Sequence, residues 1–144
     1  MILNEIVRKA EPRDLDSVVH VEKQFGVFAF KPSVFKKRFG SHLFKVLEVE
    51  GVVVGYYLVL SRKNSRTFRL YSICVDKTMH GHGYGKLLMR DAINQCGPGS
   101  TIKLEVRWDN YAAKKLYASF GFGYTKLLKG YYGDEDGVEM RLSA

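Results

Sequence analysis

The sequence has little cysteine and no long hydrophobic run, and both absences narrow the classes of protein to which it can belong. It contains 2 cysteines in 144 residues, Cys74 and Cys96, which form no metal-binding or redox motif with each other. Isolated cysteines are typical of a reducing compartment, so we expect a cytoplasmic location. The longest apolar stretch, residues 52–60, is far shorter than the roughly 20 residues of a membrane-spanning helix, so we expect no membrane association.

Composition and length favour a single folded domain. Apolar residues make up 46% of the chain and aromatic residues 13%, which argues against a disordered protein. Residues 1–5 contain no basic region that leads into a long apolar run, so the sequence predicts no signal peptide. No repeat or linker interrupts the chain, and we expect one domain over residues 1–144.

The charge balance is basic, with a formal net charge of +8 at pH 7. Such a surface suits an acidic ligand or partner, such as a multiply phosphorylated cofactor, a nucleic acid or a ribonucleoprotein. The cations are scattered, however, and form two local groups. One group surrounds a predicted hairpin turn and comprises Arg62, Lys63, Arg66 and Arg69, and the other is residues 36–38. Solvated faces commonly look like this, so we expect no specific nucleic-acid binding.

The hydrophobic pattern predicts a mixed α/β fold. Strands are expected over residues 4–9, 43–50, 52–62, 67–75, 102–107, 124–131 and 138–142. Helices are expected from Pro12, over 33–39, from the glycines near residue 83 to residue 96, and over 110–120. This order predicts a mostly antiparallel sheet with one strand–helix–strand unit.

The segment His80-Gly81-His82-Gly83-Tyr84-Gly85-Lys86 leads directly into a helical pattern. Bare glycine amides at a helix N-terminus form an anion site, and Lys86 adds a cation, so we expect a bound phosphate or diphosphate. A glycine-rich turn without a ligand is the alternative. The segment fits neither the dinucleotide fingerprint G-x-G-x-x-G nor the Walker A loop. His80 and His82 have no third ligand within sequence reach, so no metal is expected.

Three segments resemble the GNAT superfamily of acetyl-coenzyme A-dependent N-acetyltransferases over nearly the whole chain. The glycine segment is similar to the family signature Q/R-x-x-G-x-G/A, with His80 in place of the usual Gln or Arg. Residues 104–122, LEVRWDNYAAKKLYASFGF, and 131–140, YYGDEDGVEM, are similar to the ribosomal-protein alanine N-acetyltransferases and their relatives that modify protein N-termini. The resemblance implies a mixed central sheet of about seven strands flanked by about four helices.

The resemblance also implies roles for individual residues, with acetyl-CoA as co-substrate. The implied cofactor-binding residues are Ile73, Cys74, Val75, His80, Gly81, His82, Gly83, Tyr84, Gly85, Lys86 and Asn110. Glu105 is implied as the general base, and Tyr117 as the acid that protonates the departing thiolate. The implied acceptor-binding residues are Phe28, Tyr131 and Tyr132, with Phe25, Val27 and Phe30 nearby in the sequence.

Each of these residues also has a purely structural interpretation. Residues 73–75 are consistent with a core strand, Asn110 with a helix N-cap and Tyr117 with a core aromatic residue. Glu105 alternates with apolar neighbours, so its side chain points away from the core, toward a face that is commonly solvated. Tyr131 and Tyr132 are equally typical of aromatic residues at a strand end.

The favoured acceptor is a protein N-terminus, and a ribosomal protein is one candidate partner. An α-amine titrates near pH 8 and a lysine near about 10.4, so a single glutamate deprotonates the α-amine more easily. The alternatives are a small amine, such as a polyamine, amino sugar or antibiotic, and a non-catalytic basic module that binds RNA or ribosomes. A covalent acetyl-cysteine at Cys74 is not expected, because no histidine lies at a recognisable spacing from it.

Overall fold

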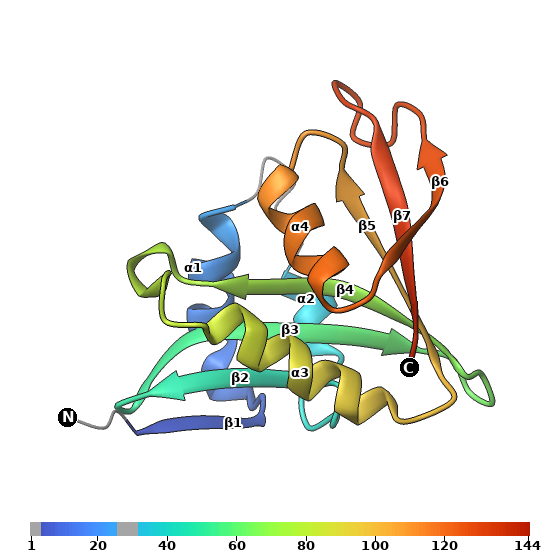
Figure 1. Ribbon diagram of the computed structural model, residues 1–144. Coiled ribbons are helices and arrows are strands. Elements are labelled where there is room, and N and C mark those ends of the chain that lie inside the picture. The colour runs from blue at the N-terminus through green and yellow to red at the C-terminus, as the bar shows by residue number, and fades with distance from the viewer. Residues whose placement is uncertain (1–3, 26–31) are drawn as a thin grey trace. The chain divides into compact units, whose positions relative to one another are not determined.

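The computed structural model describes residues 4–25 and 32–144, which form seven β-strands, four α-helices and two short 3-10 helices (Figure 1). Along the chain these elements are β1 (Glu5–Lys9), η1 (Pro12–Asp14), α1 (Leu15–Lys23), α2 (Pro32–Lys36), β2 (Phe44–Val49), β3 (Val52–Ser61), β4 (Thr67–Val75), η2 (Lys77–Met79), α3 (Tyr84–Cys96), β5 (Thr101–Arg107), α4 (Tyr111–Ser119), β6 (Gly123–Leu128) and β7 (Gly137–Ser143). The predicted α/β fold class is confirmed.

The strands belong to one mixed sheet in the order β1-β2-β3-β4-β5-β7-β6. Antiparallel pairing joins β1 to β2, β2 to β3, β5 to β7 and β7 to β6. In contrast, β4 and β5 pair in parallel, with Thr67–Arg69 opposite Thr101–Lys103. A parallel pair requires a crossover connection, and α3 lies in that connection.

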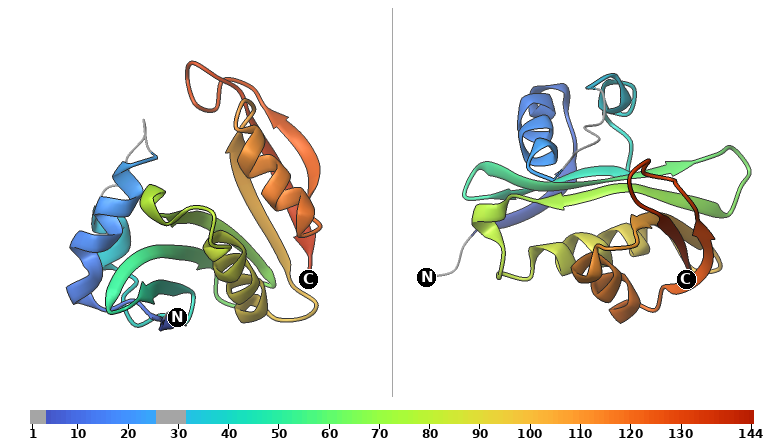
Figure 2. Two further views of the ribbon diagram at one scale, coloured as in Figure 1. Left: turned by 60° about the vertical axis from the view of Figure 1, so that its left-hand side comes forward. Right: turned by 90° about the horizontal axis from the view of Figure 1, so that it is seen from above.

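The chain divides into two compact units, Met1–Val59 with Ser72–Gln95 and Leu60–Tyr71 with Cys96–Ala144. In unit 1, α1 and α2 cover one face of the strands and α3 covers the opposite face (Figure 2). In unit 2, α4 packs against one face of β5, β7 and β6 (Figures 1 and 2). The single domain expected over residues 1–144 stays a prediction.

Aromatic and aliphatic side chains fill the core of unit 1. Phe35 of α2, Phe44 of β2 and Tyr56 of β3 are each 0% exposed. Their rings lie 5.5 to 6.4 Å apart between centroids, in tilted or edge-to-face arrangements that aromatic pairs prefer. On the opposite face, Leu88 and Met89 of α3 are fully buried. These contacts fix the strands that lead into the glycine segment.

The core of unit 2 depends on strict alternation along β5. Ile102, Leu104 and Val106 are at most 5% exposed, whereas the residues between them are partly exposed. Val138 and Met140 of β7 are buried beside them. The predicted orientation of Glu105, away from this apolar side of β5, is therefore confirmed.

Two predicted elements end earlier than expected. The helix expected over residues 33–39 ends at Lys36, because the N–H of Arg38 bonds the carbonyl of Phe35 in a tighter turn. The strand expected over residues 124–131 ends at Leu128. There the N–H of Tyr131 turns back to the carbonyl of Leu128, and Asp136 Oδ1 accepts the N–H of Gly130 at 2.8 Å. Tyr131 and Tyr132 consequently lie in a loop.

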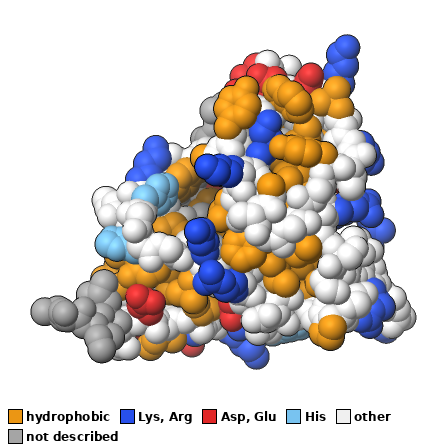
Figure 3. Space-filling view, viewed as in Figure 1, with side chains coloured by type: hydrophobic (Ala, Val, Ile, Leu, Met, Phe, Trp, Pro, Cys, Tyr) orange, Lys and Arg blue, Asp and Glu red, His pale blue; other side chains and the backbone are white. Residues whose placement is uncertain are grey.

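The surface is charged in several separate places. Lys and Arg side chains are dispersed over the face shown in Figure 3, with apolar side chains between them. Among the described helices, none combines the length and apolar character that crossing a bilayer requires. On the face shown, the Lys and Arg side chains are as dispersed as the scattered basic residues of the sequence predict.

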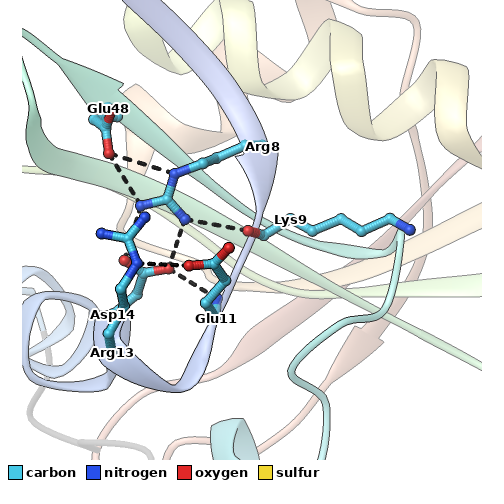
Figure 4. Close-up of polar contacts among 6 residues, drawn as sticks. All are labelled: Arg8, Lys9, Glu11, Arg13, Asp14 and Glu48. Atoms are coloured by element: carbon cyan, nitrogen blue, oxygen red, sulfur yellow. Dashed lines mark hydrogen bonds and ion pairs between the residues drawn. The ribbon is translucent and has the colours of Figure 1, made fainter.

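Arg8 of β1 forms an ion-pair cluster in unit 1 with Asp14 and Glu48 (Figure 4). Arg8 Nη1 lies 2.7 Å from Asp14 Oδ2, and Nη2 lies 3.0 Å from Glu48 Oε1. Asp14 is 3% exposed, and its Oδ2 also accepts the backbone N–H of Glu11 at 2.8 Å. The Arg8 guanidinium holds the pKa of the Asp14 carboxyl below its ordinary value. This cluster ties β1 and β2 to the start of α1.

We predict that Asp14→Asn destabilises the protein by about 3 kcal/mol at pH 7, because it leaves the buried side of Arg8 without its anion. The lowered pKa means that ionised Asp14 stabilises the fold above its unfolded pKa of about 3.9. That contribution is lost as the pH falls through the folded-state pKa. Urea unfolding from pH 7 down to pH 3 should therefore show the two proteins converging in acid.

Arg13→Gln is the matched control, since the Arg13–Glu11 pair is exposed, at 66% and 52% of the two side chains. It should change the free energy of unfolding by less than about 1 kcal/mol. A gap between wild type and Asp14→Asn that does not narrow in acid would contradict the assignment.

Candidate active site

The end of β4 is held in place by a close approach to β3 in unit 1. A Cβ atom on Gly55 would lie 2.9 Å from the Cys74 carbonyl oxygen and 3.1 Å from Leu88 Cδ1. Both distances are shorter than van der Waals contact, and the nearer atom belongs to the backbone. Gly55 therefore lets β4 and α3 pack directly on β3, which positions residues 73–75 ahead of the glycine segment.

The glycine segment turns the chain from η2 into α3. Gly81 and Gly83 have φ angles of +87° and +78°, a conformation that L side chains rarely adopt. No other atom lies within 4 Å of a Cβ built on either residue, so the turn presents bare backbone. The first helical hydrogen bond of α3 runs from the N–H of Leu87 to the carbonyl of Gly83 at 3.0 Å. The preceding amides of the first turn have no acceptor within the helix.

The first turn of α3 contributes no acidic side chain of its own to offset the positive end of the helix dipole. It contains no Asp or Glu, and Lys86 is exposed there. A cation at a helix N-terminus is unfavourable by itself and becomes favourable when an anion binds. The turn therefore has the chemistry expected of a phosphate site.

His80 joins the glycine segment to the end of β4. Its Nε2 lies 2.9 Å from the carbonyl oxygen of Val75. A carbonyl oxygen can only accept, so Nε2 carries the proton and donates. On its other side the imidazole stacks on Phe25, with centroids 5.8 Å apart and an interplanar angle of 18°. The side chain of His80 thus fixes the loop to the strand.

Cys74 lies in β4, where its environment does not favour a nucleophile. Burial raises the pKa of its thiol, so the thiol stays protonated at neutral pH. Its Sγ lies 3.7 Å from Ser72 Oγ, whose oxygen also lies 2.8 Å from the Tyr56 hydroxyl. This environment agrees with the expectation that no acetyl-cysteine forms.

Glu105 of β5 is paired with Arg69 of β4 in unit 2. Arg69 Nε donates to Glu105 Oε2 at 3.1 Å, and the two side chains are 35% and 15% exposed. The parallel register places Arg69 opposite Lys103, one position along the same face from Glu105. The carboxylate is therefore shielded and oriented by a fixed cation instead of lying on a freely solvated face.

Tyr131 and Tyr132 stack on each other in the loop between β6 and β7. Their ring centroids are 5.0 Å apart and the planes differ by 16°. Arg69 Nη2 donates to the Tyr131 hydroxyl at 3.4 Å, so the same guanidinium contacts Glu105 and the tyrosine pair. Burial raises the pKa of Tyr132 to about 12, and the neighbouring charge of Glu105 adds to this shift. Tyr132 therefore remains protonated at neutral pH.

Two further residues support this loop. Arg107 packs over the Tyr132 ring at 5.4 Å and forms ion pairs at 3.3 Å with both Asp109 and Asp134. A Cβ on Gly137 would lie 2.8 Å from Tyr132 Cε2, so a glycine is required where the ring packs on the start of β7. The tyrosine pair is thus held from the strand side and from the loop side.

The remaining predicted residues have different outcomes. Asn110 is the N-cap of α4, and its Oδ1 accepts the N–H of Ala113 at 3.2 Å. Tyr117 is partly buried in α4, with its ring 6.0 Å from the Phe122 ring. Phe28 lies outside the described residues, as do Val27 and Phe30. The roles implied for Asn110, Tyr117 and Phe28 stay predictions.

Arg69, Gly55 and Gly137 are the supporting residues that sequence reasoning missed. Arg69 could have been found, because a strand–helix–strand unit predicts that β4 and β5 are parallel neighbours and places Arg69 on the face of Glu105. Gly55 left no such signal, because the atoms that crowd it belong to Cys74 and Leu88, far along the sequence. Gly137 is crowded by Tyr131 and Tyr132 of the preceding loop, whose folded path the sequence pattern does not give.

The sequence matches the acetyltransferase (GNAT) domain over residues 10–140. The chain belongs to the GNAT family of acetyltransferases. A relative of this GNAT acetyltransferase, the uncharacterized N-acetyltransferase MJ1530 of Methanocaldococcus jannaschii, is 34% identical over 145 residues. That match covers 94% of this chain and 89% of the relative.

Solved structures agree with this assignment. The ribosomal-protein-S18-alanine N-acetyltransferase from Escherichia coli superimposes with a TM-score of 0.85 at 27% identity, covering 96% of this chain and 93% of that one. Arabidopsis thaliana Naa50, in complex with the bisubstrate analogue CoA-Ac-MVNAL, shares the fold with a TM-score of 0.84 at 20% identity, covering 97% and 99%. The resemblance to the GNAT superfamily and to its N-terminal acetyltransferases is confirmed, and the enzyme is an N-acetyltransferase.

Metal chemistry was not expected for this GNAT acetyltransferase. Among residues 4–25 and 32–144, no group of three or more His, Cys, Asp or Glu side chains is arranged to hold a metal ion. His80 donates to Val75 and His82 stacks on Tyr84 with centroids 5.4 Å apart. Both rings therefore have packing roles in the loop.

We predict that Gly55→Ala lowers both stability and affinity for coenzyme A. The new methyl group would push against the Cys74 carbonyl, which costs about 1–3 kcal/mol in a packed interior and shifts the strand that leads into the glycine segment. Thermal unfolding and calorimetric titration with coenzyme A measure the two effects.

Gly123→Ala is the control, because Gly123 also lies in a strand and has no atom within 4 Å of an added Cβ. Unchanged unfolding and unchanged coenzyme A affinity in Gly55→Ala would show that the close approach of β3 and β4 is unimportant.

Proposed function

We propose that the enzyme transfers the acetyl group of acetyl-CoA directly to the α-amine of a protein N-terminus, in a ternary complex. Members of the GNAT family transfer acetyl groups, and the E. coli relative is an alanine N-acetyltransferase of a ribosomal protein. A ribosomal protein is accordingly a candidate acceptor here, and the cytoplasm is the expected location.

Residues of unit 1 are suited to hold the co-substrate. The amides of Gly81 to Lys86 lie just before and within the first turn of α3, which has no Asp or Glu of its own, and the open space at Gly81 and Gly83 leaves room for a diphosphate. The backbone of residues 73–75 is extended, as pairing with the amides of a pantetheine arm requires. Asn110 is the further contact that the family resemblance implies. When bound, acetyl-CoA supplies an activated acetyl thioester.

In this proposal Glu105 is the general base. Its carboxylate is partly shielded and is oriented by Arg69 Nε at 3.1 Å, so it is prepared to take a proton from the acceptor amine, directly or through a water molecule. Tyr117 donates a proton to the departing thiolate. The raised pKa of Cys74 disfavours a covalent acetyl-cysteine, so direct transfer is the simpler chemistry.

One observation carries the choice of a peptide acceptor. Arg69 contacts the Glu105 carboxylate and the Tyr131 hydroxyl at once, so the stacked tyrosine pair lies beside the proposed base. Aromatic rings with hydroxyl groups can pack along an extended backbone and also hydrogen-bond to it. Phe28 is proposed as a further acceptor contact on the basis of the resemblance alone.

The test is acetylation of a panel by mass spectrometry, with acetyl-CoA, a defined library of peptides with free N-termini, and polyamines, amino sugars and aminoglycosides. We expect acetyl transfer to peptide α-amines and not to lysine side chains in N-terminally blocked peptides. If only small amines are acetylated, the acceptor is a small amine and the proposed peptide acceptor is wrong. If the protein binds RNA with a steep salt dependence and does not cleave the thioester, the proposed enzyme mechanism is wrong.

Glu105→Gln and Tyr117→Phe should each lower kcat by roughly 100-fold, because each removes one proton-transfer group. The dissociation constant for coenzyme A should stay within twofold of wild type in both, since neither residue is proposed to bind the diphosphate. Steady-state assays measure kcat, and calorimetric titration measures the dissociation constant for coenzyme A. Lys86→Gln should show the opposite pattern: weaker binding of coenzyme A with little change in kcat. A wild-type kcat in either catalytic variant would remove that residue from the mechanism.

A further inference from the structure

A polar cavity of about 300 Å³ opens in unit 2 beside the proposed base. It lies where β3 ends and where β4 and β5 run side by side. The polar residues that line it include Arg62, Ser65, Thr67, Arg69, Lys103 and Glu105. Glu105 thus belongs both to the proposed proton-transfer machinery and to the wall of this cavity.

The cavity has an excess of positive charge. Arg69 and Glu105 neutralise each other through their contact at 3.1 Å. Arg62 and Lys103 have no ion pair in the part of the chain that the structure describes. Arg66, from the same hairpin, is already engaged by the carbonyl groups of Pro98 and Gly99 and does not line the cavity. Two cations therefore face the cavity without an anion.

We propose that this cavity binds a carboxylate of the acceptor, so that the enzyme prefers peptides with Asp or Glu shortly after the N-terminal residue. The proposal rests on the proposed function, since it needs the acceptor amine at Glu105. Because Glu105, Arg62 and Lys103 line the same cavity, we place the chain that carries this amine along it, with an acidic side chain facing the two cations. The Glu105 carboxylate repels another anion, so the carboxylate of the acceptor pairs instead with Arg62 and Lys103.

The chemistry of the walls fits a carboxylate better than an apolar side chain. The lining includes the hydroxyl-bearing residues Ser61, Ser65 and Thr67, and Arg62 offers a planar donor fork. The site is partly open to solvent, so each ion pair is screened and the expected preference is moderate. Two such pairs correspond to roughly a twofold to thirtyfold preference for an acidic side chain over a neutral one.

The test uses peptides with a free N-terminus and a C-terminal fluorophore that differ only by Glu or Gln at position 2, 3 or 4. Fluorescence anisotropy, with and without saturating coenzyme A, gives the dissociation constant of each peptide. We expect tighter binding of the Glu peptide at one of these positions, and the ratio of the Gln and Glu constants is the readout. Arg62→Gln and Lys103→Gln should each reduce that ratio, and the double variant should bring it near one.

Lys63→Gln is the matched control, because Lys63 is an exposed cation in the same hairpin that does not line the cavity. It should keep the wild-type ratio. Equal binding of Glu and Gln peptides by the wild type, or an equal loss of preference in Lys63→Gln, would overturn the proposal. Binding is measured apart from turnover, so a preference without acetylation would refute the proposed function and leave the cavity assignment standing.

Discussion

The ion pair between Arg69 and Glu105 depends on the parallel register of β4 and β5. The contacts of the candidate site in unit 2 are built around that pair. Thr67–Arg69 lie opposite Thr101–Lys103, so the Arg69 side chain emerges next to Glu105 on the same face of the sheet. The guanidinium then has donors to spare for the Tyr131 hydroxyl. A shift of one residue in this register would turn Arg69 or Glu105 toward the apolar side of the sheet.

The ion pair with Arg69 orients the Glu105 carboxylate and still leaves it able to accept a proton. A carboxylate that is 15% exposed would be costly if it were unpaired, and the contact with Arg69 offsets that cost while it fixes the orientation of the oxygens. The guanidinium bonds one oxygen, Oε2, through Nε. A carboxylate has further lone pairs, so Glu105 can still accept from an amine or a water molecule. The same pairing leaves Arg62 and Lys103 as the uncompensated charges of the neighbouring cavity.

The local hydrophobic pattern of the sequence predicted most helices and strands. It could not predict most of the contacts between those elements. Alternation predicted β5 and the orientation of Glu105, and the glycine segment predicted the start of α3. The ends of α2 and β6 could not be predicted, because they are set by turn hydrogen bonds such as that from the N–H of Gly130 to Asp136. The role of Gly55 depends on atoms of Cys74 and Leu88 that folding brings near, so no local signal exists for it. The role of Gly137 depends on how the loop folds the nearby Tyr132 ring onto it, and the strand pattern does not contain that path.

The departure from the family signature at His80 has a physical explanation. Gln and Arg, the usual residues there, both end in N–H donors, and a neutral imidazole with a protonated Nε2 is a donor as well. In this chain that donor meets the Val75 carbonyl at 2.9 Å, which couples the glycine turn to the strand before it. Stacking on Phe25 adds a contact that suits the flat imidazole ring. The contact with the Val75 carbonyl needs only a hydrogen-bond donor, which an uncharged imidazole supplies, so the replacement of Gln or Arg by His keeps a donor at this position of the chain.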